Sequence, residues 1–187
     1  MAERDKKTTE SLYHRFFRGD REAVAELVNE HRVGLILFIN GYVRRTDVAE
    51  DLASDAFAAL LVKRPKIKDA ARFKTYLFSI AKNGALTWLR KNKRLTELDE
   101  NAIAPAVDDP ELELIREEEK RVVFRAIEKL TEEYRSVLIL RYYEELSAEH
   151  IAKIMKKNKK QVYNLLQRAK SAMKNILEEE GLVYETD

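Results

Sequence analysis

Apolar residues recur at a spacing of three and four along most of the chain, which is the period of one face of an α-helix. The first long run of this kind begins after Asp20 and includes Val24, Leu27 and Val28. Only five Gly and three Pro interrupt the 187 residues, and the many charged residues favour helix over strand. The sequence therefore predicts an all-α fold.

Side chains that can cap helices stand before several of these runs, where they can accept a hydrogen bond from a free backbone N–H. Asp47 is followed by Glu50, which is the spacing of a capping box. Asp69 follows the break at Pro65 and precedes a run that extends to about Arg94. The other expected N-caps are Asp20, Asp109 (before Pro110), Thr131, Ser147 and Asn158.

The charges fall into three blocks, although the net charge is only +2. Residues 1–94 hold 20 Lys and Arg against 12 Asp and Glu, residues 95–119 hold 1 against 10, and residues 120–187 hold 14 against 11. The apolar period is lost in the acidic stretch, which also contains Pro105. We therefore expect two small helical domains, residues 1–94 and 110–187, joined by a flexible acidic linker at 95–109.

The C-terminal block shows the spacing of a helix-turn-helix in SAEHIAKIMKKNKKQVYNLLQRAKSAM, residues 147–173. At 100° per residue, one side of its second helix presents polar side chains that can contact phosphates or base edges in a major groove. The DNA-binding candidates here are Ser147, Lys159, Lys160, Gln161, Asn164, Gln167 and Arg168. A small helical hairpin with a solvated polar face has the same spacing, so these residues alone leave both interpretations open.

This half resembles the promoter-binding C-terminal domain of bacterial sigma factors in the stretch AIEKLTEEYRSVLILRYYEELSAEHIAKIM. The matching residues are Leu130, Arg135, residues 137–140, Arg141, Tyr142, Leu146, Ser147, Ile151 and Ala152, and after the turn Val162, Leu166, Arg168 and Ala169. The resemblance implies recognition of the minus-thirty-five promoter element and contact with the flap of RNA polymerase.

The N-terminal half resembles the same family in two stretches. TDVAEDLASDAFAALLVK, residues 46–63, is similar to the helix by which sigma factors grip the polymerase clamp. ARFKTYLFSIAKNGALTWLRKNKR, residues 71–94, is similar to the adjoining promoter-melting segment. Two weak motifs in the family's order are more specific than either alone. The size and the missing middle domain indicate the two-domain, extracytoplasmic-function (ECF) type.

The clamp-like helix carries Asp47, Asp51 and Asp55 four residues apart on one face, with Glu50 beside them. Like charges at this spacing cost about 0.2–0.5 kcal/mol per pair, and a basic partner surface would remove that penalty. An ordinary solvated acidic face is the alternative. Within the resemblance, these four carboxylates are the expected polymerase-binding residues.

The basic stretch 72–94 sets aromatic rings among cations. We expect Phe73, Leu77, Ile80 and Trp88 to face inward. The expected outer surface comprises Lys74, Tyr76, Phe78, Lys82, Asn83, Arg90 and Lys91. Such a surface can hold unpaired promoter DNA through its phosphates and by base stacking.

The loop before this stretch, KRPKIKDAAR, is short and basic. By the resemblance it is where a flipped base of the minus-ten element would be held. We expect Lys66, Lys68 and Arg72 to form part of that pocket.

The chain departs from the family's pattern at several places. Tyr76 stands for the usual Trp, Thr87 for a frequent Asp, and His150 for a Glu that commonly helps to read the minus-thirty-five element. In the turn, residues 156–158 replace a Gly-apolar-Ser pattern, so either the turn differs or Asn158 takes the tight conformation. These changes indicate a member with its own promoter preference.

No catalytic constellation is present in the sequence. The chain has no Cys, which excludes disulfides and thiolate metal sites, and its three His residues are scattered. There is no Gly-rich phosphate loop. We therefore expect no enzyme activity, no cofactor and no metal. The N-terminus lacks a signal peptide and no run of about 18 apolar residues occurs, which predicts a cytoplasmic protein with no membrane insertion.

Two other functions are kept beside that of a sigma factor. A helix-turn-helix regulator acting without polymerase would use the same DNA surface, but it leaves the acidic face and the two-block layout unexplained. A degenerate sigma-like interaction protein that reads no promoter would account for the altered turn. The expected partners are core RNA polymerase, promoter DNA and, by the resemblance, an anti-sigma factor.

Overall fold

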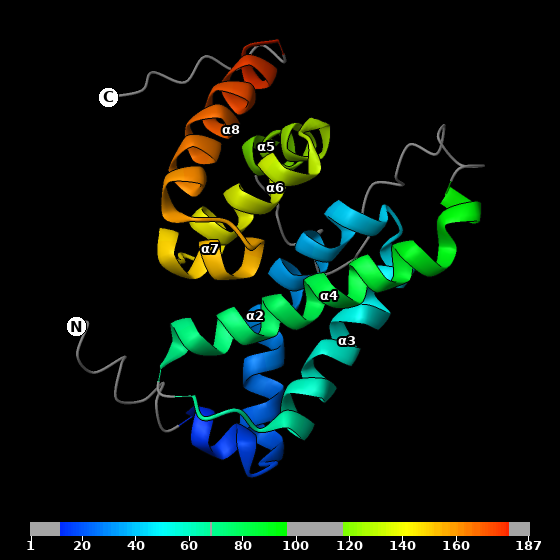
Figure 1. Ribbon diagram of the computed structural model, residues 1–187, viewed down its shortest axis with the longest axis vertical. Helices are drawn as coiled ribbons and strands as arrows, with labels where there is room; N and C mark the ends of the chain where they lie inside the picture. The colour runs from blue at the N-terminus through cyan, green and yellow to red at the C-terminus, as the bar shows by residue number, and fades with distance from the viewer. Residues whose placement is uncertain (1–11, 68, 97–117, 180–187) are drawn as a thin grey trace.

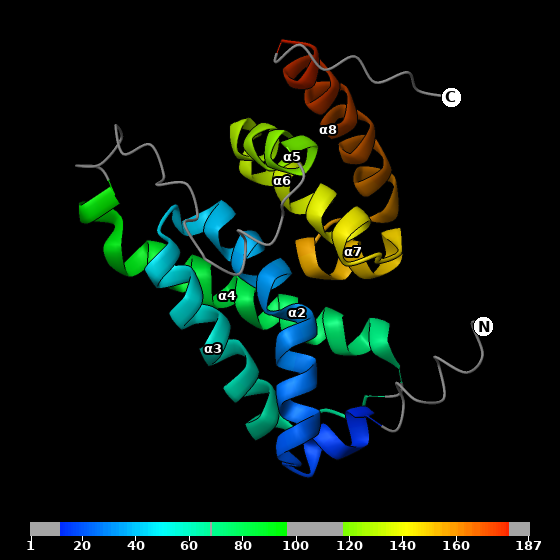
Figure 2. The same cartoon turned by 180° about the vertical axis from the view of Figure 1, so that it is seen from behind.

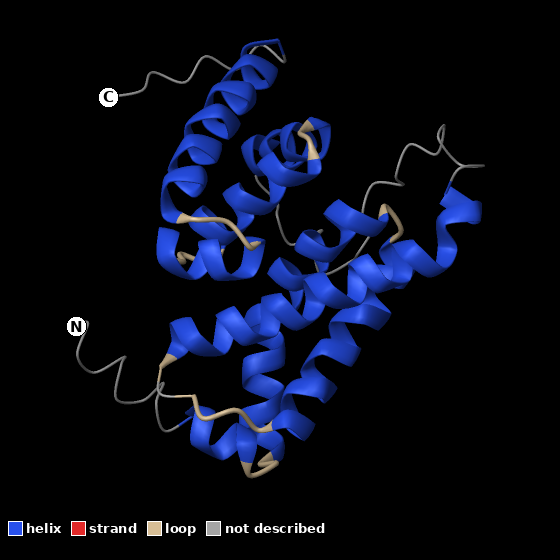
Figure 3. Ribbon diagram, in the orientation of Figure 1, coloured by secondary structure: helices blue, strands red, loops and turns tan. Residues whose placement is uncertain are grey.

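The computed structural model describes residues 12–67, 69–96 and 118–179. Every regular element in these ranges is a helix, which confirms the all-α prediction (Figure 3). After a short helical segment at residues 12–17, the elements are α2 (Arg21–Val43), α3 (Thr46–Lys63), α4 (Ala70–Thr96), α5 (Glu118–Lys129), α6 (Glu132–Leu138), the π-helical turn η2 (Ile139–Tyr143), α7 (Ala148–Met155) and α8 (Lys159–Glu179).

The helices form two groups that pack on each other (Figure 1). In the first group α2, α3 and α4 contact one another, and in the second α8 packs against α5, α6 and α7. The long helix α4 also contacts α7, and α2 contacts α6 and η2, so the groups share an interface (Figure 2). Buried apolar residues of both groups belong to one continuous core.

Buried aromatic rings hold α4 in the first group. Phe73 lies edge-on to Phe16 with ring centroids 5.3 Å apart, and Phe78 lies edge-on to Phe38 at 5.2 Å. All four side chains are fully buried. Tilted and edge-on rings are the favourable aromatic geometries, so these pairs fix α4 against α2 and the N-terminal segment.

Arg135 organises the second group from within. It is only 3% exposed and donates to the backbone carbonyls of Ile127, Glu128 and Leu130, at the end of α5. The last carbonyls of a helix have no partner inside it, so this guanidinium satisfies groups that would otherwise be buried unpaired. Burial lowers the pKa of Arg135 to about 10, which leaves it charged at neutral pH.

Four of the expected N-caps make their capping hydrogen bond. Asp20 accepts from the backbone N–H of Glu22 and of Ala23. In the other three, the side chain also accepts from a backbone N–H. Asp69 accepts from Arg72 at 2.8 Å, Ser147 from His150 at 3.4 Å and Asn158 from Gln161 at 2.9 Å.

The capping box expected at Asp47 is wrong. Helix α3 already begins at Thr46, so Asp47 lies inside the first turn and pairs with Arg45, its carboxylate oxygen 2.6 Å from a guanidinium nitrogen. Thr131 occupies the N-cap position of α6, but its side chain makes no capping hydrogen bond. The expected helix start at Asp109 and residues 97–109 of the expected linker lie outside the described residues, whereas residues 95 and 96 still belong to α4.

Candidate nucleic-acid interface

The outer side of α4 carries several of the residues expected to contact unpaired DNA. Tyr76 is 46% exposed, and Asn83, Arg90 and Lys91 are exposed as well. The Arg90 guanidinium donates to the Thr87 hydroxyl at 3.1 Å, within the same helix face. This part of the expected surface is therefore open to a ligand.

Phe78 does not belong to this surface, and its assignment to the outside of α4 was wrong. Its ring is fully buried against Phe38 of α2. Of the expected inward stripe, Phe73 and Leu77 are fully buried, whereas Ile80 and Trp88 are half-buried. Since α4 packs against both α2 and α3, it buries a face wider than a single stripe.

Lys74 and Lys82 are also not open cations. The Lys74 ammonium donates to the backbone carbonyl of Glu144 at 2.8 Å and lies 3.5 Å from its carboxylate. Lys82 is half-buried, and burial lowers its pKa, with Glu132 of α6 acting in the opposite direction. Both side chains lie where the second group of helices covers α4.

The loop before α4 and the first turn of α4 each contribute one exposed cation of the expected pocket. Lys66 is exposed, and so is Arg72, whose guanidinium lies 3.8 Å from the Asp69 carboxylate. Lys68 lies outside the described residues. The base-holding pocket that was expected from these three residues stays a prediction.

Helices α7 and α8 form the expected helix-turn-helix, with an altered turn. Lys156 takes the left-handed conformation, with φ at 55°, so Asn158 is not the residue that makes the tight turn. Lys157 stands where an apolar side chain usually fills the turn, and its ammonium instead lies 2.8 Å from the Glu133 carboxylate of α6. An ion pair thus ties the turn to the rest of the group.

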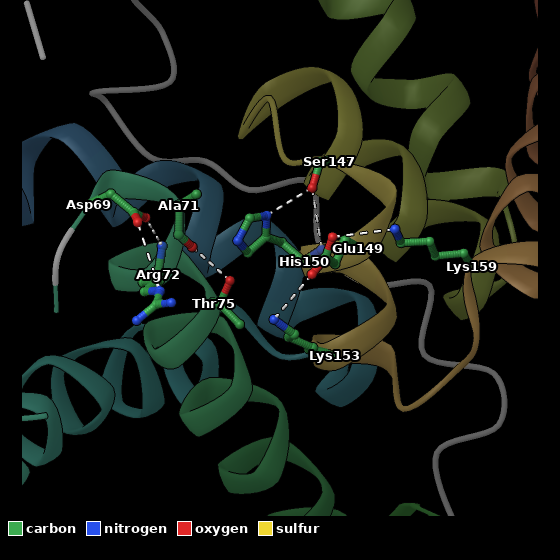
Figure 4. Close-up of polar contacts among 9 residues, drawn as sticks. All are labelled: Asp69, Ala71, Arg72, Thr75, Ser147, Glu149, His150, Lys153 and Lys159. Atoms are coloured by element: carbon green, nitrogen blue, oxygen red, sulfur yellow. Dashed lines mark hydrogen bonds and ion pairs between the residues drawn. The ribbon is translucent and has the colours of Figure 1, made fainter. Parts of the chain in front are cut away.

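Polar contacts connect the two helices of this motif (Figure 4). The Glu149 carboxylate lies 3.3 Å from the Lys159 ammonium and 3.7 Å from that of Lys153, and Lys159 holds the pKa of Glu149 below its usual range. The Ser147 hydroxyl lies 2.8 Å from Nδ1 of His150. The start of α8 is thereby fixed to the start of α7.

The outer face of α8 is exposed to solvent. Its expected DNA contacts, Lys159, Lys160, Gln161, Asn164, Gln167 and Arg168, are all exposed, and so is Ser147. The opposite face buries Val162, Leu165, Leu166 and Ala169. The periodicity predicted these two faces, and the structure agrees with it.

Sequence reasoning missed Tyr163. This ring is 59% exposed on α8, beside Asn164 and four residues before Gln167. Its angular position next to the polar side was the available signal. An exposed ring there can contact the methyl group of a thymine.

The acidic face of α3 is partly engaged within the molecule. Asp51 and Asp55 are exposed. The Glu50 carboxylate lies 3.3 Å from the Arg32 guanidinium of α2, and Asp47 is paired with Arg45 as described above. Two of the four expected polymerase contacts therefore have an internal partner.

An apolar groove of about 640 Å³ lies beside α8. Its lining comes from α2, α5, α6, η2 and α8 and includes Leu37, Val123, Ile127, Leu138, Met173 and Leu177, with Lys170 and Lys174 at α8. Apolar grooves between helices are common binding sites for a partner helix.

Two further tests of the described ranges concern membranes and metals. No described helix is long and apolar enough to cross a membrane. Among the same residues, no three His, Cys, Asp or Glu side chains are grouped so that they could hold a metal ion.

Two family models match the chain, one in each half. The model described as Sigma-70 region 2 matches residues 27–95, and the model described as Sigma-70, region 4 matches residues 120–173. The first match spans the acidic face of α3 together with the outer side of α4. The second spans the helix-turn-helix.

Relatives of known function match over most of the chain. The ECF RNA polymerase sigma-E factor of Escherichia coli K12 is 30% identical over 179 residues, covering 90% of this chain and 93% of its own length. The RNA polymerase sigma factor YlaC of Bacillus subtilis is 27% identical over 158 residues, covering 82% and 91%.

Solved structures share the fold. CnrH in complex with the cytosolic domain of CnrY matches with a TM-score of 0.60 and 19% identity, over 91% of this chain and 97% of that one. The sigma factor RpoE in complex with the anti-sigma factor NepR from Bartonella quintana also matches with a TM-score of 0.60, at 21% identity over 82% and 97%.

Proposed function

The chain belongs to the ECF sigma factors of RNA polymerase, and from that premise we propose which of its surfaces bind the polymerase and which bind promoter DNA. Sigma factors direct the polymerase to promoters and are regulatory proteins, so the polymerase carries out the chemistry and this chain is not itself an enzyme. In this proposal the clamp-binding and promoter-melting domain extends through the end of α4 at residue 96, residues 97–109 are the linker and residues 110–187 are the promoter-binding domain.

One observation supports this proposal above all. The two family models match the chain in the order region 2, then region 4, and each match includes one of the two surfaces expected to bind DNA. Region 2 falls on the helix whose outer side offers Tyr76, Asn83 and Arg90. Region 4 falls on the helix-turn-helix whose second helix exposes a row of amides and cations. The first set suits unstacked bases and phosphates, and the second suits base edges in a major groove.

The melting surface includes Lys66, Lys68, Arg72, Lys74, Tyr76, Lys82, Asn83, Arg90 and Lys91. The minus-thirty-five element is read by Ser147, Lys159, Lys160, Gln161, Asn164, Gln167 and Arg168. Two of the melting residues, Lys74 and Lys82, serve only after the second group of helices has moved off α4, because that group engages or covers them now.

Polymerase is held at two places. The carboxylates Asp47, Glu50, Asp51 and Asp55 face the clamp, with Asp51 and Asp55 the more accessible pair. The apolar groove beside α8 receives the polymerase flap, consistent with its apolar lining. An anti-sigma factor is the further partner. The protein acts in the cytoplasm, where the polymerase is.

A gel shift with core polymerase and labelled promoter DNA tests the proposal. We expect specific binding only when core is present. Specific binding by the chain alone would identify a polymerase-independent regulator. Binding to core without any added DNA specificity would identify an interaction protein, and either result would overturn the proposed function.

A further inference from the structure

Gln161 lies in the first turn of α8, the second helix of the helix-turn-helix. One end of its side-chain amide is already hydrogen-bonded within the protein. Its amide oxygen Oε1 accepts from the backbone N–H of Asn158 at 2.8 Å, while its own backbone N–H donates to Oδ1 of Asn158 at 2.9 Å. This is a reciprocal capping box across the altered turn. Both residues are exposed.

The hydrogen bond from the Asn158 N–H determines the orientation of the Gln161 side-chain amide. A backbone N–H can only donate, so the atom that faces Asn158 must be the oxygen. The Nε2 group, with its two N–H donors, is then the part of the amide left for another partner. A Gln reads adenine through donor and acceptor together, and here the acceptor is already engaged.

Resting on the proposed function, we propose that Gln161 is a specificity-determining residue that reads the minus-thirty-five element only as a donor. It prefers guanine, whose O6 and N7 both accept, or thymine through O4, over adenine, whose single acceptor N7 lies beside the N6 donor, and over cytosine, which presents only the N4 donor. First-turn residues of a recognition helix are the ones that contact base edges, which places Gln161 in reach. The backbone N–H of Asn158 holds the amide in this orientation.

The substitution Gln161→Glu inverts the chemistry while keeping the cap. A Glu at this position of a capping box still accepts from the Asn158 N–H, but its second oxygen accepts where Nε2 donated. Transcription with core polymerase from a promoter library randomised in the minus-thirty-five element reads out the preference. We expect the wild type to enrich guanine or thymine at one position, and the variant to favour cytosine there, a change of about fivefold or more.

Two further variants complete the test. Gln161→Ala loses the preference without gaining one for cytosine, whereas Asn158→Ala keeps it, because the backbone N–H of residue 158 still donates to Oε1 of Gln161. Identical base preferences in wild type and Gln161→Glu would overturn the inference. Failure of every protein to start transcription from any library member would overturn the proposed function instead, and the inference with it.

A second and independent observation concerns Glu144, which follows η2 at the interface between the two groups of helices. It is only 2% exposed, and so is the His31 side chain of α2, whose Nδ1 lies 3.3 Å from the Glu144 carboxylate. Lys74 of α4 reaches both its carbonyl and its carboxylate. A Cβ at Gly34 would collide with the Glu144 carboxylate, so Gly34 permits this approach.

Two buried polar atoms of this cluster lack a hydrogen bond. Oε1 of Glu144 and Nε2 of His31 have no hydrogen-bond partner among the described residues, although the Glu30 carboxylate lies 3.8 Å from Nε2 of His31. Buried charges and polar atoms that lack partners carry a desolvation cost that their mutual attraction only partly repays. Such a contact holds the two groups together but is released readily when another partner competes.

We infer that Glu144 is a latch that keeps the free protein closed and withholds Lys74 from unpaired DNA until core polymerase separates the two groups. This inference rests on the proposed function only for the role of Lys74. The closure itself is a property of the free chain. Glu132, facing Lys82, and the hydrogen bond from Ser136 to Tyr42 at 3.2 Å extend the same interface.

The absence of Cys from the chain allows two introduced labels to report on closure. Spin labels at Ala25→Cys on α2 and Asn175→Cys on α8, both exposed and outside the proposed polymerase contacts, give one distance distribution in the wild type. We expect Glu144→Gln to add a longer distance, and Glu145→Gln, a neighbouring exposed carboxylate, to leave the distribution unchanged. Adding core polymerase to the labelled protein that keeps Glu144 should produce the longer distance as well.

Binding of a labelled single-stranded oligonucleotide tests the role of Lys74. Glu144→Gln should bind it more tightly than the wild type, about fivefold for one released cation contact, and Glu144→Gln with Lys74→Ala should lose that gain. An unchanged distance distribution in both Glu144→Gln and the polymerase complex would overturn the latch. Unchanged oligonucleotide affinity in an opened variant would overturn the sequestration of Lys74 while leaving the closure in place.

Discussion

The two basic helices, α4 and α8, differ in how much of their polar face the rest of the molecule leaves open. Every expected DNA contact on α8 is exposed, because α8 packs through one side only. On α4, Tyr76 and Arg90 are exposed, but Lys74 is bound by Glu144 and Lys82 is half-buried. Helix α4 lies between α2 and α3 on one side and α7 on the other. Residues of the same chain can therefore bind or bury the cations of α4.

The difference teaches that a basic amphipathic pattern does not by itself define an accessible surface. Both helices carry the alternation of apolar and cationic residues that indicates nucleic-acid binding. What separates them is the arrangement of their neighbours, which pack on one side of α8 but on two sides of α4. In the proposed function the α4 surface contacts single strands only after polymerase is bound, so its partial burial in the free chain would not hinder polymerase binding.

The largest expected effect comes from removing the melting surface. Replacing Lys82, Asn83 and Arg90 by Ala should leave core binding intact but abolish open-complex formation, because no contact then holds the unpaired strand. Permanganate reactivity of promoter thymines measures this and should fall to background. The corresponding triple change on α8, at Lys160, Asn164 and Gln167, should instead weaken closed-complex binding. Unchanged permanganate reactivity in the α4 variant would refute the division between the two helices.

The next effect separates the inner and outer sides of α4. Phe73→Ala should lower the free energy of unfolding by about 3–5 kcal/mol, because it removes a fully buried ring from the aromatic cluster. The matched change on the exposed side, Tyr76→Ala, should stay within about 0.5 kcal/mol. Urea unfolding followed by circular dichroism gives both values. Equal losses would contradict the assigned faces.

A smaller effect compares the helix starts. Asp69→Ala and Asn158→Ala each remove a side-chain cap, from α4 and α8 respectively, and each should cost about 1 kcal/mol of stability. Thermal unfolding of the single variants measures the costs. Thr131→Ala serves as the control, since Thr131 makes no capping hydrogen bond and its loss should be close to neutral.

The smallest expected effect concerns the proposed phosphate contacts of α8. Lys160→Ala should weaken promoter binding by the polymerase complex uniformly across sequences and lower the slope of log K against log salt by about 0.9. Fluorescence anisotropy at several salt concentrations measures the slope. The same change at Lys74 should leave duplex binding unaltered in the closed-complex step, and an equal slope change there would show that α4 contacts the duplex directly.

Much of the fold follows from local chemistry. The caps at Asp20, Asp69, Ser147 and Asn158 could be found from the sequence because each depends on a side chain and a backbone N–H only two or three residues apart. The two faces of α8 could be found for the same reason, since helical period alone assigns them. The capping box at Asp47 was wrong because Arg45, two residues before it, takes the carboxylate.

The sites on α4 could be predicted only in part. The period identified Phe73 and Leu77 as inward residues, but Phe78 is buried because α2 approaches from a second direction. Glu144 and His31 gave no signal in the sequence, since they are more than 100 residues apart and neither belongs to a motif. Their contact depends on how two separately formed groups of helices meet.

The sequence by itself therefore determined the helices, most of their starts, the helix-turn-helix and the family. These follow from interactions that span at most one turn, or from residue order. The tertiary structure alone decided which cations remain open, which residue makes the tight turn, and where Lys157 finds its partner, Glu133. Burial and ion pairing between distant segments depend on packing geometry, and a linear pattern carries no information about the direction from which a neighbouring helix arrives.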